Sequence, residues 1–79
     1  MSSYVFERVR AMLVDKLGVA PEKVHPDSTL VELGADSLDV ADIIIDLEEA
    51  FNIEIPDRDA DNLQTVYLVV RYIDGRIKK

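Results

Sequence analysis

Cysteine and tryptophan are absent from this chain of 79 residues, and glycine and proline occur only three times each. Without cysteine the chain can form no disulfide and offers no thiol nucleophile, which fits a reducing compartment. The longest apolar run, Val66 to Val70, is far too short to cross a bilayer, and the N-terminus lacks the basic and apolar pattern of a signal peptide. We therefore expect a soluble cytoplasmic protein whose thiol chemistry, if any, comes from an added group.

Basic residues are scarce in the middle of the chain. Between Glu32 and Asp61 lie eleven of the sixteen acidic residues but only one of the nine basic ones, Arg58, and the formal net charge is -7. This charge disfavours nucleic acid and anionic membrane surfaces as partners. The length allows one small hydrophobic core, so we expect a single domain spanning residues 1–79.

The first predicted helix starts from a cap at Ser2 or Ser3 and ends before Gly18. Its predicted core face has four residues at helical spacing, flanked by Val5 and Met12: Phe6, Val9, Leu13 and Leu17. A long connection, residues 19–36, follows and is typical of a functional or tightly packed loop. Three of its apolar residues are expected to point into the core: Val24, Leu30 and Leu33.

The second predicted helix, from about Ser37 to Phe51, carries apolar residues on two opposite faces. The broader face is expected to join the core: Val40, Ile43, Ile44, Leu47, Ala50 and Phe51. The opposite face interleaves Leu38, Ala41 and Ile45 with the carboxylates of Asp42, Glu48 and Glu49. Burying this face would bury charge as well, so we expect its apolar residues to be exposed.

The same helix contains a run of acidic residues with no cation between them. Four like-charge pairs lie three or four residues apart: Asp36/Asp39, Asp39/Asp42, Asp42/Asp46 and Asp46/Glu49. Together they cost on the order of 1 to 2 kcal/mol of helix stability. An exposed apolar strip with a one-signed rim is typical of a surface that attracts a basic partner and releases it again.

After Asn52, which is expected to close the second helix, the segment Asp57 to Asn62 has acids at alternate positions, as at the start of a calcium-binding loop. We reject that site because Asn62 replaces the required glycine and Leu68 the bidentate glutamate. The last helix is expected to run from a cap at Thr65 to Gly75, with a core face of four residues: Val66, Val69, Val70 and Ile73. The predicted fold is all-α: a small four-helix bundle of three main helices and one short helix, with a long loop between the first and second.

The junction Gly34-Ala35-Asp36-Ser37-Leu38-Asp39 joins this loop to the acidic helix. Either Asp36 or Ser37 can cap the helix, and Asp39 has capping-box spacing. A phosphoester on a serine here would lie at the positive end of the helix dipole, although a serine at a helix start is most often only a cap. His25 has no second histidine or cysteine to complete a zinc site, and Gly-x-Ser-x-Gly is absent, so we predict neither a metal site nor a catalytic residue.

The hexapeptide, followed by Leu47-Glu48-Glu49-Ala50-Phe51 and Glu54-Ile55-Pro56-Asp57, resembles the acyl carrier protein family, in particular the free-standing carriers of fatty acid synthesis. Leu17-Gly18-Val19 and Tyr72-Ile73 fit the family's order and spacing, so the resemblance spans nearly the whole chain. It implies that Ser37 carries a 4'-phosphopantetheine arm derived from coenzyme A. Acyl groups would be held on this arm as thioesters, and the chain itself would not be an enzyme.

The resemblance also implies partners: a phosphopantetheinyl transferase, and acyl-transferring and acyl-modifying enzymes with basic docking surfaces, which a monomeric carrier would visit. The residues implied in docking are Asp36, Leu38, Asp39, Ala41, Asp42, Ile45, Glu48 and Glu49. We further hypothesise that a short acyl chain enters between the second and last helices, among Ile43, Ile44, Leu47, Leu63, Val66 and Val70.

Two residues depart from the family pattern: Asp46, where the family often has a small apolar residue, and Arg58, in an otherwise acidic stretch. These departures leave the pathway open, and the capping role of a serine at a helix start leaves a second alternative. The chain could serve a specialised polyketide, peptide or other dedicated acyl pathway, or it could be an unmodified acidic interaction module in which Ser37 is only a cap.

Overall fold

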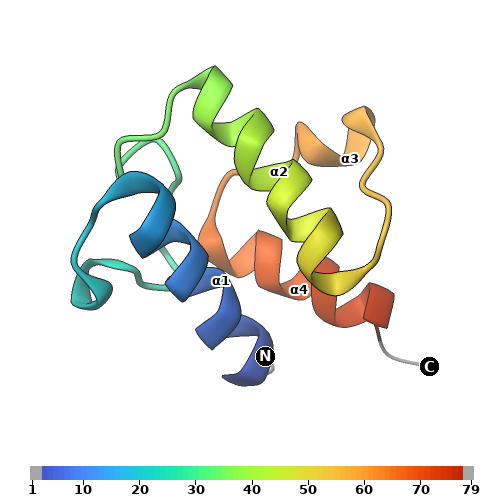
Figure 1. Ribbon diagram of the computed structural model, residues 1–79, viewed down its shortest axis with the longest axis horizontal. Helices are drawn as coiled ribbons and strands as arrows, with labels where there is room; N and C mark the ends of the chain where they lie inside the picture. Colours follow the sequence, from blue (N-terminus) through green and yellow to red (C-terminus); the bar gives the residue numbers. More distant parts are fainter. Residues whose placement is uncertain (1–2, 78–79) are drawn as a thin grey trace.

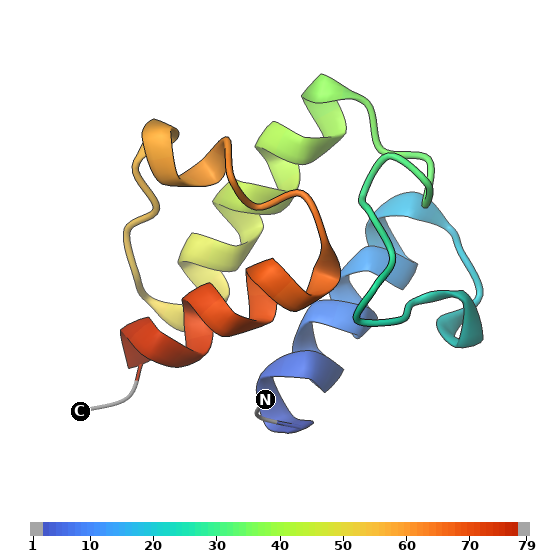
Figure 2. The ribbon, with the colours of Figure 1, turned by 180° about the vertical axis from the view of Figure 1, so that it is seen from behind.

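The computed structural model describes residues 3–77 and is all-helical, as predicted (Figure 1). The elements are α1 (Ser3–Leu17), the short 3-10 helix η1 (Pro21–Lys23), α2 (Ser37–Phe51), α3 (Asp57–Ala60) and α4 (Val66–Ile77). Helix α1 packs against both α2 and α4. Seen from behind, α3 lies beside α2, and the segment after α3 crosses in front of α2 on its way to α4 (Figure 2). Within the described range no helix is both long enough and apolar enough to span a membrane.

The buried face of α1 is rotated from the predicted one. Val5, Val9 and Leu13 are buried, whereas Phe6 and Leu17 are only partly buried. Phe6 lies at the edge of the face, where the Arg10 guanidinium covers its ring at 5.4 Å. Ser3 is the first helical residue rather than a cap, and Ser2 lies outside the described residues.

Gly18 ends α1 as predicted. It adopts the left-handed conformation (φ +69°), and its N–H donates to the Val14 carbonyl at 2.9 Å. A residue with a Cβ would be strained in this conformation, which explains the glycine at the helix end.

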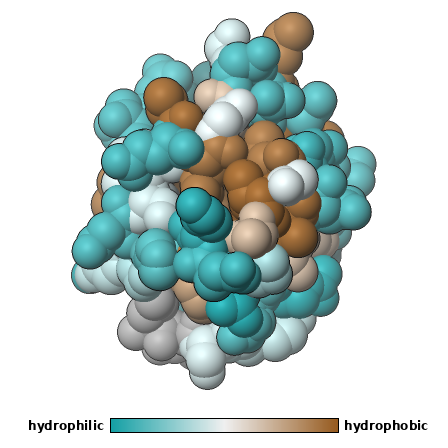
Figure 3. All heavy atoms as spheres, turned by 90° about the vertical axis from the view of Figure 1, so that its left-hand side faces the viewer, coloured by the Kyte–Doolittle hydropathy of each residue, from teal (hydrophilic) through white to brown (hydrophobic). Residues whose placement is uncertain are grey.

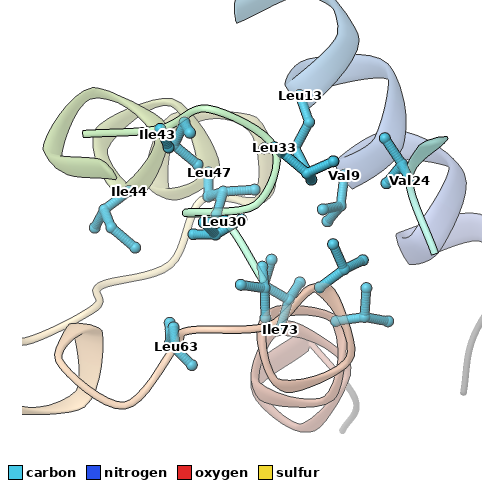
Figure 4. Packing of buried hydrophobic residues seen from close by; sticks show 14 of the residues in the cluster. Val9, Leu13, Val24, Leu30, Leu33, Ile43, Ile44, Leu47, Leu63 and Ile73 are labelled. Atoms are coloured by element: carbon cyan, nitrogen blue, oxygen red, sulfur yellow. The ribbon is translucent and has the colours of Figure 1, made fainter. Parts of the chain in front are cut away.

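The connection between α1 and α2 is tightly packed. Val24, Leu30 and Leu33 are buried, which confirms their predicted role (Figure 4). The connection also pairs with the segment before α4, because Leu30 N–H donates to the Gln64 carbonyl and Val66 N–H to the Ser28 carbonyl, each at 2.9 Å. These backbone bonds satisfy polar groups that would otherwise be buried without partners.

Helix α2 contributes Ile43, Ile44 and Leu47 to the buried core (Figure 4). Val40 and Phe51 pack against that core, but Ala50 is exposed, so its predicted burial is wrong. At this end of α2 the contacts from α1 reach Phe51 instead: the Tyr4 ring meets it edge-on at 6.4 Å, and the Arg8 guanidinium lies 5.7 Å from its centroid. Asn52 closes the helix in the left-handed conformation, as predicted.

Helix α4 begins after Thr65, whose hydroxyl accepts the Leu68 N–H at 3.1 Å, and this confirms the predicted cap. The four predicted core residues are all buried: Val66, Val69, Val70 and Ile73. The predicted end at Gly75 is wrong, because the helix continues to Ile77. Gly75 lacks the positive φ that Gly18 and Gly34 have, and a glycine ends a helix mainly by adopting that conformation.

Candidate functional site

The start of α2 separates the roles of two neighbouring residues. Asp36 is the cap: its carboxylate accepts the Asp39 N–H at 2.9 Å, while Asp36 N–H donates to the Asp39 carboxylate at 3.2 Å. This confirms the predicted capping box. Ser37 is the first helical residue, is exposed, and makes no side-chain hydrogen bond to any described residue. Its hydroxyl is therefore free for modification.

The backbone before Ser37 explains how the loop presents it. Gly34 has φ +96°, a conformation open to glycine at little cost, and the chain then turns so that Ala35 is buried. Ala35 N–H donates to the Leu30 carbonyl at 3.0 Å. Buried Ala35 anchors the junction directly before the exposed pair Asp36 and Ser37. An anion on Ser37 would gain roughly 0.3 to 1 kcal/mol from the helix dipole.

The predicted exposed strip of α2 is exposed. The exposed fraction is 75% for Leu38 and 51% for Ile45, and Ala41 is exposed between them. Asp42 and Glu49 are exposed beside this strip, whereas Asp39 and Glu48 are partly buried. This confirms the predicted exposure of the apolar residues on this face, and the part of these residues in docking stays a prediction.

Glu48 has a structural contact that its place in the acidic run did not indicate. Its carboxylate accepts the Ile55 N–H at 2.7 Å, so it fastens the link between α2 and α3. Hydrogen bonds to a charged acceptor are among the stronger ones in proteins. Glu48 therefore holds the backbone in addition to contributing charge to this face.

Asp46 pairs with a cation from another helix. Lys16 Nζ of α1 lies 2.7 Å from the Asp46 carboxylate. The hydrogen bond to Asp46 is the main cause of a raised pKa for Lys16, and Asp42 adds to it. The acidic run thus receives a counter-charge from α1, and Asp46 joins the two helices.

An open groove of about 990 Å³ lies beside Ser37. Its walls come from α2, the α1–α2 connection and α3, and they include Ala35, Ser37, Val40, Ala41, Ile44, Ile45, Ile55, Ala60 and Leu63. Glu48 and three aspartates, Asp36, Asp57 and Asp61, also line it. An apolar groove with a polar margin that begins at an exposed hydroxyl has the size and lining typical of a small-molecule binding site.

This groove has a different lining from the acyl pocket predicted between the second and last helices. Ile44 and Leu63 line it, and they come from different parts of the core (Figure 4). The other four predicted residues are buried in the core and are not in its wall: Ile43, Leu47, Val66 and Val70. The hypothesis from sequence did not include Val31, Ile55 and Ala60, which also line the groove. Ile55 and Ala60 are apolar residues on either side of the acidic turn that contains Asp57, and this pattern could have indicated that they face an apolar groove.

Hydrophobic side chains also gather on the side of the molecule where the α1–α2 connection runs, within a hydrophilic surround (Figure 3).

His25 of this connection is exposed, and its backbone N–H donates to the Ser28 hydroxyl at 3.0 Å. The Ser28 hydroxyl donates in turn to the Lys23 carbonyl at 3.2 Å. This places the His25 backbone in a local turn.

Comparison with known proteins agrees with this geometry. The family described as "Phosphopantetheine attachment site" matches residues 7–73. A protein of Wolinella succinogenes named "Acyl carrier protein" is 51% identical over 71 residues, which are 89% of this chain and 93% of that protein. Proteins of the same name from Campylobacter fetus and Thermosynechococcus vestitus are 49% and 45% identical, over 90% and 95% of this chain and 94% of each relative.

These matches cover most of the chain and include the exposed serine, the capped helix start and the groove. The cofactor of this family is 4'-phosphopantetheine, and its members carry acyl groups without catalysing reactions themselves. The chain belongs to the acyl carrier protein family.

Proposed function

We propose that Ser37 is the attachment site of the 4'-phosphopantetheine arm, and that the protein delivers acyl thioesters to enzymes of fatty acid biosynthesis in the cytoplasm. The observation that carries the proposal is the position of Ser37. Its exposed hydroxyl is released from capping by Asp36 and lies between the groove and the exposed strip of α2. One helix start thus joins an attachment point, a space for cargo and a docking surface.

Attachment is a phosphoryl-group transfer from coenzyme A by a separate transferase. The Ser37 oxygen forms a bond to the phosphorus that bears the pantetheine, and the bond from that phosphorus to the bridging pyrophosphate oxygen breaks. The nucleotide 3',5'-ADP leaves with the electron pair, and the hydroxyl proton passes to a base of the transferase. When bound, the arm supplies a terminal thiol that holds acyl groups.

Docking is assigned to the exposed side of α2. Leu38, Ala41 and Ile45 offer apolar contact, and carboxylates such as Asp42 and Glu49 surround them. Their field favours encounter with a basic partner, and a small apolar contact lets the complex dissociate quickly. A partner held there meets the arm at Ser37, which directly precedes Leu38 and lies about one helical turn from Ala41.

The groove beside Ser37 is the proposed site for an acyl chain. Ile44 and Leu63 belong to both the earlier hypothesis and the groove, and Ile55 and Ala60 extend the apolar lining toward α3. Partial burial shields a chain from water at a gain proportional to the apolar area covered.

The pathway assignment draws on the acidic character of α2, which is typical of the fatty-acid type. Asp46 is one of the two unusual residues, with Arg58, that leave a specialised polyketide, peptide or other dedicated acyl pathway open. Its ion pair with Lys16 gives it a structural role and weakens that argument. An assay of the loaded protein as a substrate of elongation enzymes of fatty acid synthesis would decide between the pathways. Elongation would support the fatty-acid pathway, and no elongation would support a dedicated one.

The test of attachment is the intact mass after incubation with coenzyme A and a broad-specificity phosphopantetheinyl transferase. The wild type is expected to gain one phosphopantetheine, and Ser37→Ala to gain none. Ser28→Ala is the matched control: Ser28 is held by local hydrogen bonds in the connection, so this variant should still be modified. A folded wild-type protein that gains no mass would support the unmodified interaction module instead.

A further inference from the structure

Helix α3 is the least anchored wall of the groove. It has four residues, none of them buried, and its cap residue Pro56 provides no side-chain hydrogen bond. Asp57, Ala60 and the following Asp61 line the groove. A helix this short has little stability of its own, so tertiary contacts must determine its position.

Within residues 3–77, one side-chain hydrogen bond joins α3 to another helix. The Tyr72 hydroxyl of α4 donates to the Asp59 carboxylate at 2.7 Å. Arg76 Nη1 donates to the same hydroxyl oxygen at 3.1 Å, and its guanidinium carbon lies 5.5 Å from the Tyr72 ring centroid. Burial of the ring, followed by the bond to Asp59, raises the pKa of Tyr72 above its ordinary value of 10.0, at which a phenol already keeps its proton at neutral pH.

We infer that Tyr72 is a positioning residue that holds α3 against the groove, and that its hydrogen bond to Asp59 limits the length of acyl chain that the groove encloses. The inference rests on the proposed function, because it takes an acyl chain on Ser37 as the occupant.

The α2 and α3 walls of the groove differ in how much of the structure must move to displace them. Ile44 on α2 is part of the buried core, so displacing that wall would disturb the packing of the whole molecule. The α3 turn lies between two buried anchors, Ile55 and Leu63, and the Tyr72–Asp59 bond is its side-chain link to another helix. This turn can therefore move outward between its anchors once that bond opens. A chain too long for the closed groove must therefore open this bond or remain partly in solvent.

The variant that tests this is Tyr72→Phe, which keeps the ring in place and removes only the hydroxyl. The chain contains a matched control in Tyr67→Phe. The Tyr67 hydroxyl accepts from Arg71 at 3.1 Å, and the Arg71 guanidinium carbon lies 5.8 Å from the ring centroid, but Tyr67 has no bond to α3. The two substitutions remove the same atom from similar Tyr–Arg pairs of α4.

The first measurement is amide hydrogen exchange of the unloaded proteins at Ala60 and Asp61, whose N–H groups donate to Pro56 and Asp57 within the α3 turn. Opening a hydrogen bond to a charged acceptor is expected to speed exchange roughly ten-fold in Tyr72→Phe. Tyr67→Phe should match the wild type. Equal exchange in all three proteins would overturn the role of Tyr72 in holding α3.

The second measurement loads each protein with straight saturated acyl chains of increasing length and records the Tm for each length. In the wild type, the Tm should rise with each enclosed methylene and then level off when the groove is full. In Tyr72→Phe it should level off at a longer chain, and in Tyr67→Phe at the wild-type length. An unchanged plateau in a Tyr72→Phe protein with fast α3 exchange would overturn the limit on chain length.

Variants of Asp59, which accepts the hydrogen bond from Tyr72, test the other side of this contact. Asp59→Ala should reproduce both effects of Tyr72→Phe, and Asp59→Asn, which keeps an acceptor oxygen, should restore much of the wild-type behaviour. If no protein can be loaded at Ser37, the proposed function fails and the chain-length limit with it, while the exchange data still decide whether Tyr72 holds α3.

Discussion

At the scale of single residues, neighbouring side chains at the start of α2 have different tasks. Asp36 and Asp39 satisfy each other's backbone N–H groups, which leaves the adjacent Ser37 hydroxyl unused by the helix. A capping serine would have its oxygen engaged by the backbone, which would compete with its use as an attachment point. The division explains why an acid precedes the serine.

Replacing Asp36 with alanine should lower the free energy of unfolding by about 1 kcal/mol, because the Asp39 N–H loses its acceptor. Urea unfolding followed by circular dichroism at 222 nm would measure the change. Asp36→Asn, which keeps a capping oxygen, is the control and should retain most of the stability. Equal stability of Asp36→Ala and the wild type would show that the capping box contributes nothing measurable.

At the scale of elements, α2 has two apolar faces with different purposes. Leu47 is fully buried in the core, whereas Leu38 is 75% exposed near the start of the same helix. The carboxylates between the exposed residues keep that face out of the core, since burying them without partners would be costly. The helix therefore stabilises the fold with one side and exposes the other, which is the proposed docking surface.

The two faces predict opposite results for the same substitution. Leu47→Ala should lower the free energy of unfolding by about 2 to 5 kcal/mol, because it leaves a cavity in the core. Leu38→Ala should change it by less than about 0.5 kcal/mol, as is usual for exposed sites. Thermal or urea unfolding measures both, and a large loss from Leu38→Ala would mean that this face is buried in solution.

At the scale of the whole molecule, charge is distributed unevenly. The net charge is -7, and most carboxylates lie between Glu32 and Asp61. The ion pair of Lys16 with Asp46 relieves some of the repulsion on α2 by bringing a cation from α1. The remaining one-signed field is available to attract basic partners.

Salt should therefore stabilise this protein. Raising the ionic strength from about 0.01 M to about 0.1 M shortens the screening length from about 30 Å to about 10 Å and weakens the repulsion among the carboxylates. We expect a higher urea midpoint in the saltier buffer. The Lys16→Gln variant, which has one cation fewer, should gain more from the added salt than the wild type. A midpoint that falls with salt would show that attractive pairs dominate instead.

Most of the fold follows from local pattern. The helix starts at Asp36 and Thr65, the stop at Gly18 and the inward-facing Leu30 and Leu33 were predicted from residue type and spacing. The errors lie where spacing alone is ambiguous. Gly75 stays helical because nothing there requires a positive φ, and Val5 replaces Phe6 in the core because the position of α2 and α4 sets which face of α1 is covered.

Motifs spread along the sequence indicated the class of protein through their resemblance to a family. The exposed serine and the two faces of α2 followed from the sequence by itself, because they depend on residues close together in the chain. The tertiary structure alone decided three other features: the Lys16–Asp46 pair, the groove walled by α3, and the bond from Tyr72 to Asp59. Each joins residues from different elements, and their approach depends on how the helices pack around a common core. The periodicity of residues along the chain does not specify how closely two such elements approach each other.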